Sequence, residues 1–208
     1  MSETIVVLGV VLQVVAWRLV ARDALSFWPA VTSTFALCGI ASLLAGDPRC
    51  CSQTAFLDAS AFGLASGLLL FGATRVVVDL ATRRPSLHGA VAGVYRRSQE
   101  TSIATAFVLT LVIAVPGEEL FWRGFVLPEL RDVTTSTIGT LVAWLAAVGV
   151  NAAWASAPLL AGAVVGGAVW TGLAAWSGGV VAPIASHLVW TGLMLRWPPR
   201  AARGNVPS

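Results

Sequence analysis

Apolar residues in this chain fall in long runs rather than alternating with polar ones. A helix needs about 20 such residues to cross a hydrocarbon core about 30 Å thick. Short breaks rich in charge, proline or glycine separate the runs. The pattern predicts an all-α fold, a polytopic transmembrane helical bundle of about seven spans. The expected spans lie near residues 4–21, 27–45, 59–80, 102–122, 134–154, 157–176 and 178–195.

The composition places this bundle in a membrane. Of the 208 residues, 57% are hydrophobic and 11% are charged, whereas soluble domains carry about 25% charged residues. The spans fill the chain and leave no room for a soluble domain or a linker. We therefore expect one membrane domain over residues 1–208, with the lipid bilayer as its surroundings.

Charge placement predicts the orientation, because loops on the cytoplasmic side collect basic residues. All basic residues are arginines, and most follow the first or third span or the last one. Glu3 precedes the first apolar run and no positive charge does, which favours an uncleaved first helix. We expect an N-out, C-in topology. Residues 83–99 are read either as an interfacial amphipathic helix or as an ordinary arginine-rich connection.

The remaining composition excludes several functions. The net charge of +3 is explained by membrane orientation, and the arginines are not grouped with stacking aromatics, so we expect no nucleic-acid partner. Cys38 is expected in the core, and Cys50 and Cys51 in an external loop, with no zinc spacing. The pairs Gly63/Gly67 and Gly162/Gly166 are typical of closely packed helices.

Two glutamates and an arginine stand out in the fourth expected span, where lipid disfavours charge. Glu119 and Arg123 are four residues apart and share a helix face, so they can pair. Glu118 points about 100° away from Glu119 and is expected to stay unpaired. A carboxyl group in a poorly hydrated site can act as a general base or acid near neutral pH. Glu118 is therefore the candidate catalyst, and the other reading is a triad that only ties helices together.

The last span adds His187 and Thr191, which lie four apart on one face. A lone histidine in an apolar helix is usually a hydrogen-bonded packing residue. His187 is of more interest because the bundle also holds a carboxylate pair that it can meet. No histidine lies in any other expected span.

Glu-Glu-x-x-x-Arg-Gly-Phe from Glu118 to Phe125, followed by Pro-Ile-Ala-x-His ending at His187, resembles the CPBP family of intramembrane proteases. That family includes CAAX prenyl endopeptidases and bacteriocin-processing or immunity proteins. The resemblance covers about residues 100–195. It implies that Glu118 activates water and that Glu119 pairs with Arg123, the same assignment that the spacing indicates.

The sequence departs from the family at two positions. The second motif, Phe-x-x-x-His, aligns best with residues 150–154, where Trp154 replaces the histidine. The third motif, His-x-x-x-Asn, ends here at Thr191. The indole of Trp154 or the amide of Asn151 can donate a hydrogen bond in place of the missing histidine, but neither can accept a proton as histidine does.

We therefore expect an intramembrane endopeptidase with catalytic residues Glu118, Glu119, Arg123 and His187, and with Asn151, Trp154 and Thr191 as auxiliary or oxyanion groups. Its substrate would be a peptide or membrane protein. We expect no metal and no cofactor, because catalytic zinc usually takes three protein ligands. The alternatives are a silent relative that binds a partner and, less supported, a proton-coupled transporter. Arginine-only basic usage and abundant Ala, Val and Gly suggest a bacterial cytoplasmic membrane.

Overall fold

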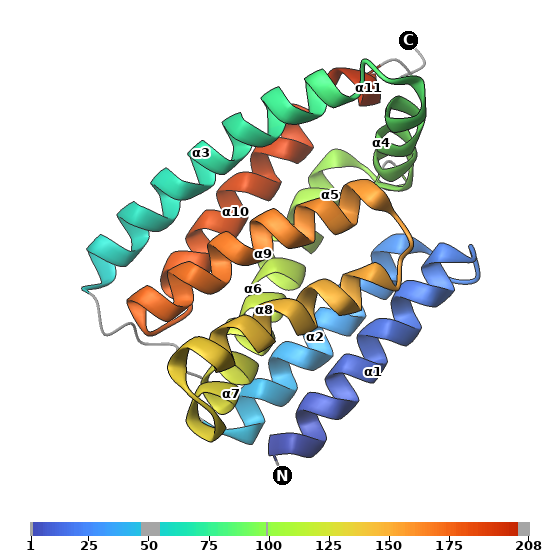
Figure 1. The fold of residues 1–208 in the computed structure, drawn as a ribbon. Coiled ribbons are helices and arrows are strands. Elements are labelled where there is room, and N and C mark those ends of the chain that lie inside the picture. The colour runs from blue at the N-terminus through green and yellow to red at the C-terminus, as the bar shows by residue number, and fades with distance from the viewer. Residues whose placement is uncertain (1, 47–54, 99, 204–208) are drawn as a thin grey trace.

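The computed structural model describes residues 2–46, 55–98 and 100–203, and in them the fold is all-helical, with no strand (Figure 1). One long central helix runs unbroken from Ile103 to Val133. It comprises α5 (Ile103–Val108), η1 (Leu109–Ala114), α6 (Val115–Glu119), η2 (Leu120–Val126) and α7 (Leu127–Val133). The others are α1 (Ser2–Ala21), α2 (Phe27–Ala45), α3 (Phe56–Ala81), α4 (Pro85–Ser98), α8 (Ser136–Ala152), α9 (Ala157–Ser177), α10 (Val181–Arg196) and α11 (Arg200–Arg203).

Each of the seven expected spans corresponds to a helix. In the described residues, five helices are long and apolar enough to cross a membrane: α1, α2, α3, α9 and the central helix. The other two are shorter, since α8 has 17 residues and α10 has 16. The all-helical membrane class is therefore confirmed, while the number of spans and the orientation remain predictions. Cys50 and Cys51 lie outside the described residues.

Helix ends follow local sequence. The hydroxyl of Ser102 accepts a hydrogen bond from the Thr105 amide at the start of α5, and Thr135 does the same for Ile138 at the start of α8. The helix α9 ends at Gly178, whose φ of 72° is left-handed, a conformation that glycine adopts without steric penalty. The chain then turns sharply into α10, which carries His187.

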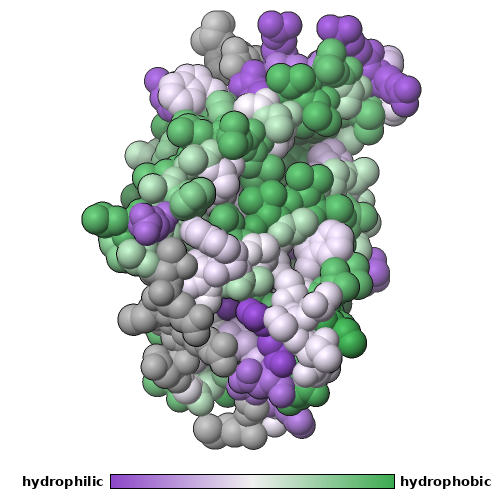
Figure 2. Space-filling model, turned by 60° about the vertical axis from the view of Figure 1, so that its left-hand side comes forward, coloured by the Kyte–Doolittle hydropathy of each residue, from purple (hydrophilic) through white to green (hydrophobic). Residues whose placement is uncertain are grey.

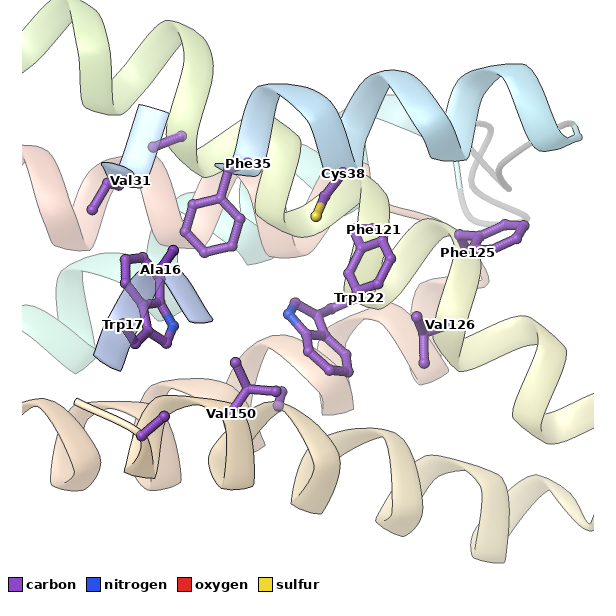
Figure 3. Packing of buried hydrophobic residues seen from close by; sticks show 13 residues of the cluster. Ala16, Trp17, Val31, Phe35, Cys38, Phe121, Trp122, Phe125, Val126 and Val150 are labelled. Carbon is purple, nitrogen blue, oxygen red and sulfur yellow. The ribbon is translucent and has the colours of Figure 1, made fainter. Parts of the chain in front are cut away.

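The main hydrophobic core lies between α1, α2, the central helix and α8 (Figure 3). Aromatic rings fill much of it. Trp17 packs edge-on against Phe35, and Phe121 packs edge-on against Trp122. Gln13 is the polar exception: its side-chain oxygen accepts a hydrogen bond from the Trp122 indole at 3.1 Å, and its amide donates to the Cys38 sulfur. Cys38 is buried, as expected from the sequence.

A second close contact joins α3 to α10 along their length. It depends on glycine, because a Cβ at Gly63 would lie 2.5 Å from the Ala182 carbonyl oxygen, and one at Gly67 would lie 2.6 Å from that of Ser186. The expectation for this pair is confirmed. The second pair behaves differently: Gly162 has only ordinary contacts, and Gly166 makes room for the Trp170 ring of its own helix.

The surface matches a lipid-facing bundle. Large apolar side chains are exposed along the helices, such as Leu69, 75% exposed, and Leu44, 81% exposed. Figure 2 shows a mostly hydrophobic middle with hydrophilic residues gathered toward the upper and lower ends. Within residues 83–99 the helix α4 confirms the helical part of the first interpretation, while its position at the membrane interface remains a prediction.

Candidate functional site

The central helix is widened into π-helical turns on both sides of Glu118 and Glu119. Each widened segment precedes a proline and includes the residue four positions before it, Val112 for Pro116 and Gly124 for Pro128. A proline ring lacks an N–H and clashes with the carbonyl four residues back. Prolines therefore explain where the helix widens, and π-turns of this kind occur often at functional sites.

Glu119 forms the centre of a buried cluster. Its side chain is fully buried, and its Oε1 accepts a hydrogen bond from Nη1 of Arg123 at 3.2 Å. The same oxygen lies 2.7 Å from Nδ1 of His187, which α10 brings across from 68 residues further along the chain. The pairing of Glu119 with Arg123 follows the spacing in the sequence, while the pairing with His187 is a tertiary contact.

Glu118 is not unpaired, contrary to the sequence-based expectation. Its Oε1 lies 3.7 Å from Nη1 of Arg123. In an ideal α-helix, residues five apart face different directions, but in the π-turn each N–H bonds five residues back, and this aligns residues five apart. Arg123 therefore reaches both carboxylates. The two glutamates still differ in access to water, because the Glu118 side chain is 18% exposed and that of Glu119 is 0% exposed.

Trp170 of α9 completes the cluster. Its ring stacks on the imidazole of His187 with centroids 3.6 Å apart and planes 15° apart, and the Arg123 guanidinium carbon lies 5.6 Å from its centroid. A Cβ at Gly166 would lie 2.8 Å from the same ring, so this glycine leaves the space that the ring occupies. Trp170 therefore fixes the plane of the histidine ring.

Glycines also position the two catalytic candidates against their neighbours. A Cβ at Gly117 would collide with the Phe35 carbonyl oxygen of α2, and one at Gly39 would lie 2.9 Å from the Cα of Gly117. The close approach at Gly67 falls beside Ser186, the residue before His187. Backbone contacts on both sides thus set the depth and rotation of the segments that carry Glu118 and His187.

The three auxiliary candidates lie in different surroundings. Trp154 stacks on Trp17 with ring centroids 5.2 Å apart and also packs against Phe27, so its ring takes part in the hydrophobic core. The Asn151 amide donates to the Ala147 carbonyl of its own helix at 2.9 Å. Thr191 has a buried hydroxyl that makes no hydrogen bond in the described part of the protein. Of these three, Thr191 is the one with a buried side-chain polar atom that lacks a hydrogen bond among the described residues.

Further buried polar atoms of the same helices lack hydrogen-bond partners among the described residues: Oε2 of Glu119, Nε of Arg123, Nε1 of Trp170 and Oγ of Ser186. Buried polar atoms are nearly always hydrogen-bonded, so the atoms of Glu119, Arg123 and Trp170 leave the cluster with unused hydrogen-bonding capacity. Within the described residues, no group of three His, Cys, Asp or Glu side chains could hold a metal ion.

Sequence reasoning missed two features. Nothing in the sequence marks Trp170 as a site residue except that two glycines precede it. An aromatic residue in such a position is more often part of the hydrophobic core. Arg75 and Asp79 were missed although their spacing of four in an apolar span is a clear signal. They pair at 3.2 Å, and Arg75 also donates to the Trp197 carbonyl at 2.6 Å. The third expected span therefore also holds an ion pair.

The fold and the site define an integral membrane protein of bundled helices that carries a buried glutamate–arginine–histidine cluster. Residues 100–193 match the family model described as type II CAAX prenyl endopeptidase Rce1-like. This matched segment holds both glutamates, Arg123 and His187, so the family model agrees with the CAAX protease family that the motifs resemble. No curated protein and no solved structure matches the chain significantly.

Proposed function

We propose that the protein is an intramembrane endopeptidase that hydrolyses a peptide bond at the Glu118–Glu119–Arg123–His187 cluster. The observation that carries this proposal is the pair of adjacent glutamates in different surroundings. Glu119 is held by Arg123 and His187, whereas Glu118 has one longer ion pair and is partly exposed. Glu118 is therefore the carboxylate that water can reach, and Glu119 organises the other two groups.

In this mechanism Glu118 takes a proton from water as the oxygen attacks the peptide carbonyl carbon. The resulting tetrahedral intermediate carries a negative oxygen, and its collapse breaks the C–N bond as Glu118-H returns the proton to the leaving amine. The products are a carboxylic acid and an amine, and the enzyme ends unchanged. General base catalysis of this kind contributes about 100- to 10,000-fold to the rate.

The contact with Glu119 limits what His187 can do. An ionised Glu119 accepts the Nδ1–H, so a neutral imidazole offers a lone pair at Nε2 and cannot donate there. His187 can donate to the oxyanion only when both ring nitrogens are protonated. We assign it that role, with the free hydroxyl of Thr191 as a second donor.

The test is cleavage by the purified protein in lipid nanodiscs, with prenylated CAAX peptides and unmodified hydrophobic peptides as substrates. Prenylated peptides are included because the matching family is named for them. The native protein should cleave, and Glu118→Gln should reduce the rate by at least about 100-fold while remaining folded. Cleavage that survives Glu118→Gln would reject Glu118 as the base.

The second candidate is a catalytically silent relative that binds a peptide or membrane protein at the same cluster. Trp154 favours it, because this residue replaces the histidine of the family's second motif and its ring packs in the core. A folded native protein that binds these peptides but cleaves none of them would select this reading over the protease.

A further inference from the structure

A shallow groove of about 430 Å³ opens on the surface between α3, α5 and α10. Its floor is formed by α10 from Leu188 to Arg196, its sides by Leu68 and Phe107, and one end by Trp197. The lining is apolar except at that end, where Arg196 lies. Leu68 is 57% exposed and Trp197 is 47% exposed, so the groove opens outward.

The groove has the dimensions and depth of one lipid chain in one leaflet. From Leu188 to Arg196 the helix rises about 12 Å at 1.5 Å per residue, and half of a hydrocarbon core of about 30 Å is about 15 Å. Trp197 marks the polar end of the groove, and tryptophans are enriched at the boundary between hydrocarbon and headgroups. The apolar end points toward the middle of the membrane.

The charged end of the groove favours lipids with an anionic headgroup. The Arg196 guanidinium stacks over the Trp197 ring at 5.6 Å, and no carboxylate of the described residues pairs with it. Other exposed arginines lie at the same end of the bundle, on the last turn of α4 and just after α3. An anionic headgroup therefore meets a positive surface at the depth where its phosphate sits.

We propose that this groove is a binding site for an anionic phospholipid of the bilayer, with one acyl chain along α10 and the phosphate on Arg196. Gly192 leaves the space for the chain, because a Cβ there would have only ordinary contacts, the nearest at 3.7 Å to Leu111 and Phe107. The proposal does not depend on catalysis, since neither Arg196 nor Gly192 belongs to the Glu118–His187 cluster.

The experiment titrates the purified full chain in detergent with phosphatidylglycerol or phosphatidylcholine of identical acyl chains, with bound lipid counted by native mass spectrometry. The native protein should bind phosphatidylglycerol more tightly. Arg196→Gln should weaken phosphatidylglycerol binding by about fivefold, as expected for one arginine at a membrane surface, and leave phosphatidylcholine unchanged. Gly192→Leu fills the groove and should reduce binding of both lipids.

Two matched controls make the result decisive. Gly72→Leu adds the same side chain at an exposed glycine with no neighbour within 4 Å, and Arg83→Gln removes an exposed arginine outside the groove. Equal effects of Gly192→Leu and Gly72→Leu, or of Arg196→Gln and Arg83→Gln, would overturn the proposal, as would equal binding of both lipids by the native protein. If Gly192→Leu fails to fold, the arginine comparison decides alone.

Discussion

At the scale of single residues, the cluster is held together by one buried carboxylate oxygen. Oε1 of Glu119 contacts both Arg123 and His187, and neither Glu119 nor Arg123 is reached by solvent to any extent. Removing one member of a buried pair leaves the other charged without compensation. Glu118 differs because it is partly exposed and its distance to Arg123 is longer.

This difference predicts separate effects on stability and chemistry. Glu119→Gln and Arg123→Ala should each lower the free energy of unfolding by roughly 3–5 kcal/mol, while Glu118→Gln should change it far less. Thermal unfolding of the purified variants in one detergent, together with the folded yield from membranes, measures this. Equal destabilisation by all three would mean that Glu118 is a structural residue.

Trp170 allows a second residue-scale prediction, read from His187 rather than from activity. Trp170→Leu should remove the stacked ring and broaden or shift the imidazole ¹⁵N signals of His187, whereas Trp170→Phe, which keeps an aromatic face, should preserve most of the native spectrum. The sequence has two histidines, so His88→Gln identifies the signal. Native-like spectra for Trp170→Leu would show that the ring does not position His187.

At the scale of elements, the packing of α3 on α10 determines where His187 lies. The two backbones approach each other at glycines, and the contact at Gly67 falls on Ser186. Gly72, five residues further along the same helix, faces open space. The same substitution should therefore have different consequences for stability at these two glycines of one helix.

We expect Gly67→Ala to destabilise the protein by about 1–3 kcal/mol, since the new methyl group meets backbone rather than a movable side chain. Gly72→Ala should leave stability unchanged or raise it slightly, because alanine is the better helix former. Paired unfolding curves in one detergent give the difference. A neutral Gly67→Ala would mean that α10 can shift away from α3 without cost.

At the scale of the whole molecule, charge is distributed unequally between the two ends of the bundle. The arginines that follow α1 and α3 and those at the end of α10 gather near α4, where Arg97 pairs with Asp23 at 3.0 Å. Exposed Glu3 and Asp58 lie at the starts of α1 and α3. Basic residues accumulate on the cytoplasmic side of membrane proteins.

The arginine-rich end, which includes the C-terminal end of α10, should therefore face the cytoplasm. A green fluorescent protein fused after the last residue should fluoresce, and alkaline phosphatase fused at the same point should stay inactive. The reverse pattern would place this end outside and would contradict the N-out, C-in topology.

The sequence by itself determined the class of the protein and the residues around which its site forms. Long runs of apolar residues predict helices in lipid. A helix pairs its backbone N–H and C=O groups within the segment, and lipid offers these groups no other partner. Charges at Glu118, Glu119 and Arg123 mark a protected site because of their cost in lipid. The spacing of four between Glu119 and Arg123 was enough to predict their ion pair.

Only the tertiary structure decided which groups meet. The contact of His187 with Glu119 joins residues 68 apart, and the stacking of Trp170 depends on a third helix, so no local spacing encodes either one. The ion pair of Glu118 with Arg123 arises because the helix widens next to a proline, which changes which side chains share a face. The place of Trp154 in the core likewise depends on Trp17, which lies on another helix.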